Sequence, residues 1–239
     1  MMAVLPDGQR TVMGSNSSIQ RSSLAIKKTQ YSSPLVYASD INCEYKETSK
    51  EFGSSESSVY SINLSITSVG DKSLVVMEYL GKYKSTALID PRGKLIDFNF
   101  IDPKDGKRTT SETYQERIGE QRSSLDESLR SRAQFVNPFS LFMPEFHKIS
   151  QLSVNKSVAN ITMEDGQNWG EYVYRGLSQY NGRSVIVLDL VRIPPTLSDS
   201  TAVLYGYNLI DAETKLPVLT VLDAGTKNVV ENISCGTRE

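Results

Sequence analysis

The sequence predicts a mainly β protein: a strongly curved antiparallel sheet, an unclosed barrel, built from two similar meanders and covered by a helix at about residues 110–135. Three observations predict this fold. Apolar and polar residues alternate over several short stretches, tight-turn signals separate those stretches, and one eight-residue motif occurs twice. Alternation with a period of two is typical of half-buried strands.

The repeated motif is a strand–turn–strand corner. Residues 88–95 read LIDPRGKL and residues 209–216 read LIDAETKL, so five of the eight positions are identical. Around each corner we expect the same order of strand, tight turn, strand, loop, strand, corner and strand. A duplicated meander explains this order and predicts pseudo-repeats over about 58–106 and 154–235. The alternative is that two hairpins rich in Asp, Gly and Lys resemble each other by composition.

The domain organisation follows from composition. Residues 1–34 are rich in Ser and have little periodicity, which predicts a flexible leader, with a merely frayed terminus as the alternative. Residues 35–239 are predicted to form a single β-rich domain. Within it, a helix and a loop over residues 110–146 link the two pseudo-repeats.

Two stretches of the first pseudo-repeat have clear strand patterns. In residues 58–67 the apolar side chains fall on one face, namely Tyr60, Ile62, Leu64 and Ile66. In residues 95–101 the same spacing places Ile96, Phe98 and Phe100 on one face.

The linking segment changes period. Tyr114, Ile118, Leu125 and Leu129 follow at steps of four, seven and four, which predicts an amphipathic helix laid across the sheet. Residues 135–146 are then strongly apolar but interrupted by prolines. This loop is interpreted as a core plug, as the wall of a ligand cavity or as a partner-binding loop. The predicted ligand-binding residues come from both parts: Tyr114, Ile118, Leu125, Phe139, Phe142 and Met143.

The second pseudo-repeat contains the strongest hairpin signal of the chain. Asn181-Gly182 matches a type I′ turn. The strand after it, residues 185–191, is apolar on both faces, so we expect it at the centre of the sheet.

Charge and cysteine content limit the possible partners. The net charge is −2 and no basic cluster occurs, which argues against nucleic acid as a partner. No apolar run reaches the roughly 18 residues that cross a bilayer, so we expect no membrane span. Cys43 and Cys235 fall in the first and last predicted strands, so a disulfide is expected if the sheet brings those strands together. Two unrelated thiols in a reducing compartment are the alternative.

Catalytic patterns are missing from the sequence. His147 is the single imidazole, and no nucleophile elbow or phosphate-binding loop occurs. Asp90, Asp165 and Asp211 fall at turns, where Asp is favoured for local hydrogen bonds. We therefore expect no enzymatic activity, no metal and no cofactor.

Four stretches, in this order of strands and helix, resemble a known family. They are Phe142-Met143-Pro144, Asp165–Trp169, Tyr174–Arg183 and Leu209–Leu216. The pattern resembles bacterial envelope proteins of the lipoprotein-carrier type, the LolA/LolB-like fold. The resemblance implies a helix-covered, unclosed barrel that shields an acyl chain or another apolar ligand.

The sequence thus predicts a non-enzymatic envelope protein that holds an apolar ligand on the concave face of its sheet. The alternative is an assembly scaffold that binds another envelope protein through Phe139–Phe146 or a sheet edge. The expected location is periplasmic or secreted. Because no secretory signal is recognised at the start of the sequence, a cytoplasmic location stays open.

Overall fold

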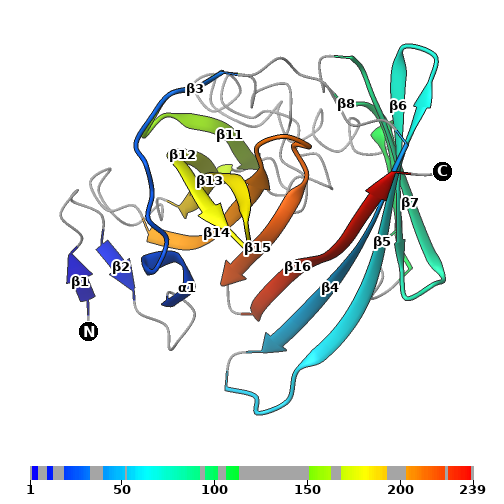
Figure 1. The fold of residues 1–239 in the computed structure, drawn as a ribbon. Coiled ribbons are helices and arrows are strands. Elements are labelled where there is room, and N and C mark those ends of the chain that lie inside the picture. Colours follow the sequence, from blue (N-terminus) through cyan, green and yellow to red (C-terminus); the bar gives the residue numbers. More distant parts are fainter. Residues whose placement is uncertain are drawn as a thin grey trace, which may run out of the picture.

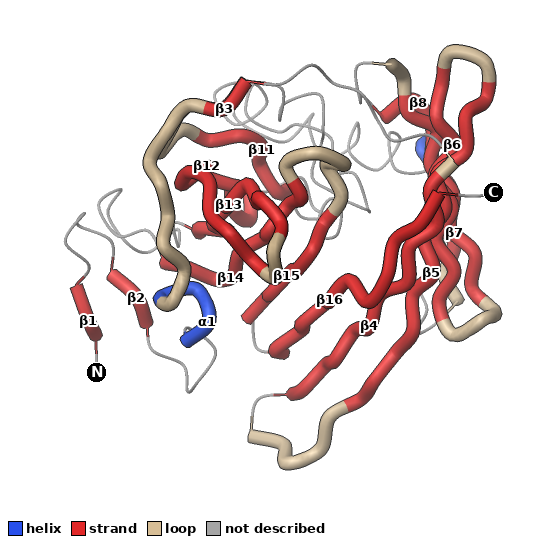
Figure 2. Tube along the Cα trace, viewed as in Figure 1, coloured by secondary structure: helices blue, strands red, loops and turns tan. Residues whose placement is uncertain are grey.

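The structure is a computed structural model, and it describes residues 2–4, 10–12, 19–32, 40–51, 53–91, 95–101, 106–112, 151–162, 168–192, 203–223 and 226–237. Most of these residues lie in one large sheet, in which consecutive long strands pair antiparallel (Figures 1 and 2). The two ends of the row of strands do not pair with each other in the described part of the chain. The prediction of a mainly β fold with one curved, unclosed sheet is therefore confirmed.

The first half of the sheet is a meander in which each strand pairs with the next. Its strands are β4 (Ile41–Glu51), β5 (Ser58–Val69), β6 (Lys72–Tyr79), β7 (Tyr83–Ile89), β8 (Leu95–Ile101) and β9 (Arg108–Thr110). Gly70 and Gly81 have positive φ angles of 64° and 66° in the tight turns on either side of β6. Glycine adopts this conformation without the steric cost that other residues meet.

The second half is a meander of the same kind. Its strands are β11 (Ser157–Thr162), β12 (Asn168–Tyr180), β13 (Arg183–Arg192), β14 (Val203–Asp211), β15 (Pro217–Asp223) and β16 (Thr226–Thr237). Asn181 and Gly182 join β12 to β13 with φ angles of 49° and 78°. A type I′ turn requires positive φ at both central residues, so the predicted hairpin is confirmed.

Five short elements lie outside the two meanders. They are β1 (Met2–Val4), β2 (Arg10–Val12), α1 (Ile19–Ser22), β3 (Tyr31–Ser32) and β10 (Gln151–Leu152). β3 pairs with β10 in a separate two-stranded sheet, whereas β2 joins the large sheet by a single pair beside β14.

The two meanders join at the centre of the sheet. β16 pairs antiparallel with β4 along its length, and these strands lie side by side in Figure 1. The chain therefore runs from the centre outward to β9, and returns from the opposite edge, β11, to the centre. Cys43 and Cys235 are directly opposite each other across this seam and are joined by a disulfide, with their Cα atoms 4.1 Å apart.

The repeated motif occupies equivalent positions in the two halves. It connects β7 to β8 in the first half and β14 to β15 in the second, in each case the fourth strand of the meander to the fifth. The pairing register also shifts at the same step of the motif, at Leu88–Ile89 and at Leu209–Ile210. The surroundings of the two corners thus agree, and duplication of the meander remains our interpretation of that agreement.

Most of the predicted strand faces are correct. Ile62, Leu64 and Ile66 are each 1% exposed, and every residue from Val185 to Val191 is buried, as expected for a central strand. The prediction for Ile96 is wrong, because its side chain is 45% exposed. The register shift in the β7–β8 pair places an extra residue in β8, so Ile96 leaves the face that Phe98 occupies.

Two further predictions concern the segments outside the meanders. The helix at about 110–135 and the loop that follows it lie outside the described residues from 113 onward. Residues 19–32, which composition assigned to a flexible leader, lie against the second half of the sheet in Figure 1. They belong to the folded domain, and we call them the strap.

Candidate functional site

The predicted ligand-binding residues cannot be placed on the sheet. Tyr114, Ile118, Leu125, Phe139, Phe142 and Met143 all lie outside the described residues, as does His147. Their role stays a prediction. The described strands nevertheless show the face of the sheet that these residues are predicted to cover.

One continuous apolar cluster covers a single face of the sheet, which we call the inner face. In the first half it includes Ile62, Leu64, Val75, Met77 and Ala87, and in the second half Tyr174, Ile186, Leu188, Leu190 and Ile210. Each of these side chains is at most 2% exposed. Because the cluster crosses the β4–β16 seam, both meanders contribute to one apolar interior.

A small group of polar side chains interrupts the inner face in the second half. Asn208 and Thr220 are 1% and 7% exposed and lie directly opposite each other on β14 and β15. The hydrogen bond between the Asn208 side chain and the buried Tyr172 hydroxyl lowers the pKa of Tyr172, so the Asn208 amide is its donor. Thr220 Oγ1 has no hydrogen-bond partner among the residues that the structure describes.

The opposite face of the second half is also apolar. Val185, Val187, Leu209, Leu219 and Val221 form an outer cluster, against which Leu24 and Ile26 of the strap pack. β13 is therefore buried on both faces because the core covers one and the strap the other.

The strap passes around the edge of β12. Lys27 exchanges two backbone hydrogen bonds with Leu177, at 2.7 and 3.0 Å, beyond the point where β11 stops pairing with β12. Gly176 makes this approach possible, because a Cβ there would lie 2.4 Å from the Lys27 carbonyl oxygen. On the inner side, the Tyr174 hydroxyl donates a hydrogen bond to the Thr29 carbonyl oxygen at 2.9 Å.

A buried ion cluster fixes the start of the strap. Asp189 is fully buried on β13, and its carboxylate accepts hydrogen bonds from Arg21 Nε at 2.6 Å and from Arg175 Nε at 2.8 Å. Arg175 Nη1 also donates to Asn155 Oδ1 at 2.7 Å. Charge-assisted bonds of this kind are among the stronger ones in proteins. Two guanidinium groups share one carboxylate. Removing the carboxylate therefore leaves both cations unpaired, whereas removing one guanidinium group leaves the carboxylate paired with the other.

The far end of the strap meets the second copy of the repeated motif. Lys215 is 2% exposed, and its Nζ donates hydrogen bonds to the Tyr31 hydroxyl and the Ala212 carbonyl oxygen. Asp211 Oδ1 accepts the backbone N–H groups of Glu213 and Thr214, at 2.9 and 2.8 Å. This confirms the turn role expected for Asp211.

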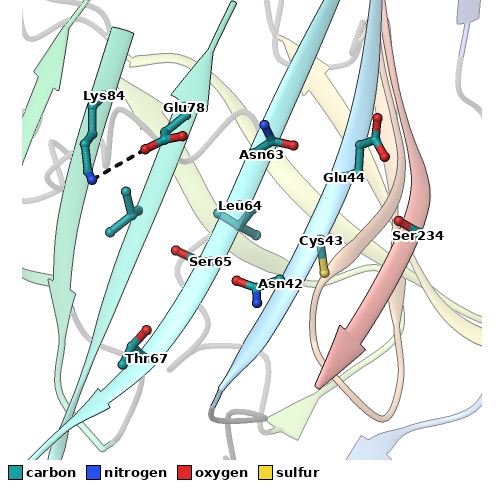
Figure 3. Close-up of a pocket in the computed structure, with 11 residues that line it drawn as sticks. Asn42, Cys43, Glu44, Asn63, Leu64, Ser65, Thr67, Glu78, Lys84 and Ser234 are labelled. Atoms are coloured by element: carbon teal, nitrogen blue, oxygen red, sulfur yellow. Dashed lines mark ion pairs between the residues drawn. The ribbon is translucent and has the colours of Figure 1, made fainter. Parts of the chain in front are cut away.

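A polar hollow of about 570 Å³ lies on the outer face of the first half, and Figure 3 shows its lining. One row of directly opposed residues crosses five strands there: Ser234, Glu44, Asn63, Glu78 and Lys84. Glu78 and Lys84 form an ion pair at 3.4 Å, with both side chains well exposed. This lining suits polar groups, so an apolar ligand is better matched by the inner face of the same strands.

The described residues contain no group of three or more metal-ligating side chains placed to hold a metal ion. Within the same residues, no helix is both long and apolar enough to cross a membrane.

Sequence reasoning missed the strap and the ion cluster. One signal was available: Asp189 interrupts an apolar run, VIVLDLV, that was expected to be buried on both faces. A carboxylate in such a strand needs a cationic partner, and Arg21 and Arg175 are those partners. The polar pair on the inner face has a similar signal, because Asn208 lies in the apolar stretch before the second corner.

The comparisons with known proteins find likeness only among solved structures. No protein-family model matches the chain, and no curated protein matches it in sequence. A structure described as an outer membrane lipoprotein-sorting protein domain, from Vibrio parahaemolyticus, is similar at 10% identity and a TM-score of 0.34, over 84% of this chain and 86% of that one. A DUF1329 family protein from Desulfovibrio piger has the same identity and coverage and a TM-score of 0.31. TM-scores this low carry no argument about function, which has to come from the chain's own residues.

Proposed function

We propose that this protein is a non-enzymatic binding protein of the cell envelope that holds an apolar, acyl-type ligand against the inner face of its sheet. The observation that carries the proposal is the apolar cluster that both meanders share across the central seam. Ligand sites for small molecules are predominantly apolar, with a few polar groups placed to orient the ligand. The inner face has this composition, whereas the outer face of the first half is polar.

The sequence supplies the second part of the proposal. Residues 110–146 contain the apolar side chains expected to cover the sheet, and a ligand would lie between them and the inner face. The envelope location rests on the resemblance found in the sequence and on the disulfide, since disulfides persist in oxidising compartments.

Two neighbouring residues on β6 provide a matched test. Val75 is fully buried on the inner face, and Val76 lines the hollow on the outer face. In a titration with a fluorescent fatty acid, Val75→Phe is expected to weaken binding at least several-fold, because the larger side chain takes up space on the inner face. Val76→Phe is expected to bind as the unmodified protein does.

Circular dichroism and urea unfolding of both variants check that they are folded, since overpacking costs about 1–3 kcal/mol. Absence of saturable binding by the unmodified protein, together with no lipid in organic extracts of protein purified without detergent, would refute the proposed function.

An assembly scaffold is the second candidate, and the sheet edges favour it. β9 and β11 end the row of paired strands, and each has a strand neighbour on one side only among the described residues. An unpaired strand edge can accept a strand from another protein. A variant that introduces a charged residue into β11 and abolishes capture of one defined partner, with ligand binding intact, would support this candidate over the first.

A further inference from the structure

We propose that the polar hollow on the outer face of the first half is a second binding site, which takes an uncharged oligosaccharide laid across the strands. The proposal goes beyond the acyl ligand of the inner face, and neither site requires the other. The hollow measures about 570 Å³, which lies within the range of about 300–1,000 Å³ typical of ligand pockets. Figure 3 shows its polar side chains gathered over neighbouring strands.

The row of polar side chains that crosses the hollow has the dimensions of a short sugar chain. Its members lie on five adjacent strands, β16, β4, β5, β6 and β7, and are Ser234, Glu44, Asn63, Glu78 and Lys84. Neighbouring strands are about 4.8 Å apart, so the row spans roughly 19 Å over four strand spacings. A sugar ring is similar in length to one such spacing. Successive units of a linear oligosaccharide can therefore meet successive strands.

The lining offers the mixture of donors and acceptors that sugar hydroxyl groups need. A sugar hydroxyl both donates and accepts hydrogen bonds, as do the amides of Asn42 and Asn63 and the hydroxyls of Ser65 and Thr67. The Glu44 carboxylate accepts only. The exposed side chains of Asn42, Glu44 and Asn63 form no hydrogen bond or ion pair with another residue that the structure describes. These groups are therefore available to a ligand.

The residue types distinguish this hollow from an ordinary solvent-facing surface. One polar face is normal for an antiparallel sheet, but Asn is among the residues depleted in strands. Asn42 and Asn63 nevertheless occupy β4 and β5, two adjacent strands near the centre of the sheet. Contacts of their side chains within the described part of the chain do not account for this choice. Recognition of a polar ligand does.

The charges of the lining favour an uncharged ligand. The lining contains two carboxylates, Glu44 and Glu78, and one ammonium group, Lys84. Because Lys84 pairs with Glu78 at 3.4 Å, no cation among these lining residues is left to pair with an anionic ligand. Glu44 is a single exposed carboxylate, which adds little attraction for a cation. An apolar ligand would deprive the polar groups of hydrogen bonds to water without replacing them.

NMR titration of isotope-labelled protein with the neutral trisaccharides of glucose, galactose, mannose and N-acetylglucosamine tests the site. At least one should shift the amide signals of Asn42, Asn63 and Ser65 in a saturable manner. Asn63→Ala should weaken that binding about two- to tenfold, which corresponds to the loss of one hydrogen bond. Ser61→Ala is the matched control and should leave the affinity unchanged. Ser61 is exposed on the same face of β5, two positions earlier, and is not among the described lining residues.

The outcomes separate this site from the acyl site of the inner face. Val75→Phe should leave the affinity for the sugar unchanged, and Asn63→Ala should leave acyl binding unchanged. Absence of saturable shifts with all four neutral sugars would overturn the second site, whatever the fatty acid titration shows. Shifts confined to inner-face residues would overturn it as well.

The choice of an uncharged ligand has its own test. Tighter binding of trigalacturonic acid than of every neutral trisaccharide would overturn that choice. Urea unfolding of each variant without ligand establishes that the comparison is made between folded proteins.

Discussion

Replacement of Asp189 by Asn would leave two guanidinium groups without their shared carboxylate. Asp189 is fully buried, and the side chains of Arg21 and Arg175 are 17% and 8% exposed. Removing one partner of a buried ion pair typically costs about 3–5 kcal/mol, because the remaining charge is uncompensated. We expect Asp189→Asn to lower the free energy of unfolding by this amount. Arg21→Leu leaves Asp189 paired with Arg175, and should cost less, about 1.5–3 kcal/mol.

Urea unfolding, followed by circular dichroism, measures both values, and hydrogen exchange reports on the strap separately. Both variants should speed exchange of the Lys27 and Leu177 amides, because Arg21 holds the start of the strap on the sheet. Glu78→Gln serves as control, since exposed ion pairs contribute less than about 1 kcal/mol. If Asp189→Asn costs no more than Arg21→Leu, the carboxylate does not balance two cations and the reasoning about this cluster is refuted.

Three other perturbations address the seam, the strap and the buried hydroxyls. Reduction of the bond between Cys43 and Cys235, which are 192 residues apart, should destabilise the protein by about 2–5 kcal/mol, and an unchanged urea midpoint in reductant would contradict this. Gly176→Ala should displace the strap and speed amide exchange in it. Gly236→Ala should not, because a Cβ at Gly236 meets nothing within 4 Å. Equal exchange rates in the two variants would count against the close contact between Gly176 and Lys27. Burial raises the pKa of Tyr174 to about 12 in the folded protein. The stabilising contribution of its neutral hydroxyl to folding is therefore complete below about pH 10, the pKa of an unfolded tyrosine, and is lost as the pH rises toward the folded-state pKa. The free energy of unfolding of Tyr174→Phe should therefore fall less over this alkaline range than that of the unmodified protein. Identical pH profiles of the two proteins would show that ionisation of the Tyr174 hydroxyl does not destabilise the fold.

The strands of both meanders could be predicted because their signals are local. Alternation in residues 58–67, the Asn181-Gly182 turn and the doubly apolar run at 185–191 each depend on neighbouring residues alone. The same holds for the second corner, whose Asp211 accepts hydrogen bonds from backbone N–H groups two and three positions later. The pairing of β4 with β16 is different, because it places Cys43 opposite Cys235, which is 192 positions away in the sequence. The two cysteines were the one sequence feature that indicated it.

The strap could not be predicted because its contacts are distant and few of its residues are apolar. Arg21 pairs with Asp189, which is 168 positions away in the sequence. Lys27 pairs with β12 through backbone atoms, and backbone hydrogen bonds cannot be recognised from the pattern of side chains. The predicted orientation of Ile96 was wrong for a related reason. A single extra residue in β8 reverses the face of a side chain, and alternation alone does not reveal where such a bulge falls. The polar pair at Asn208 and Thr220 needed the strand register before its two members could be seen as neighbours.

Photo-crosslinking with a diazirine-bearing acyl chain tests the central claim most directly, because peptide mass spectrometry then shows which face of the sheet the ligand touches. The account predicts labels on inner-face residues such as Leu64 and Met77, and an excess of the same acyl compound without the diazirine should suppress them. Labels confined to outer-face residues such as Asn63 and Val76, or no saturable labelling at all, would contradict it.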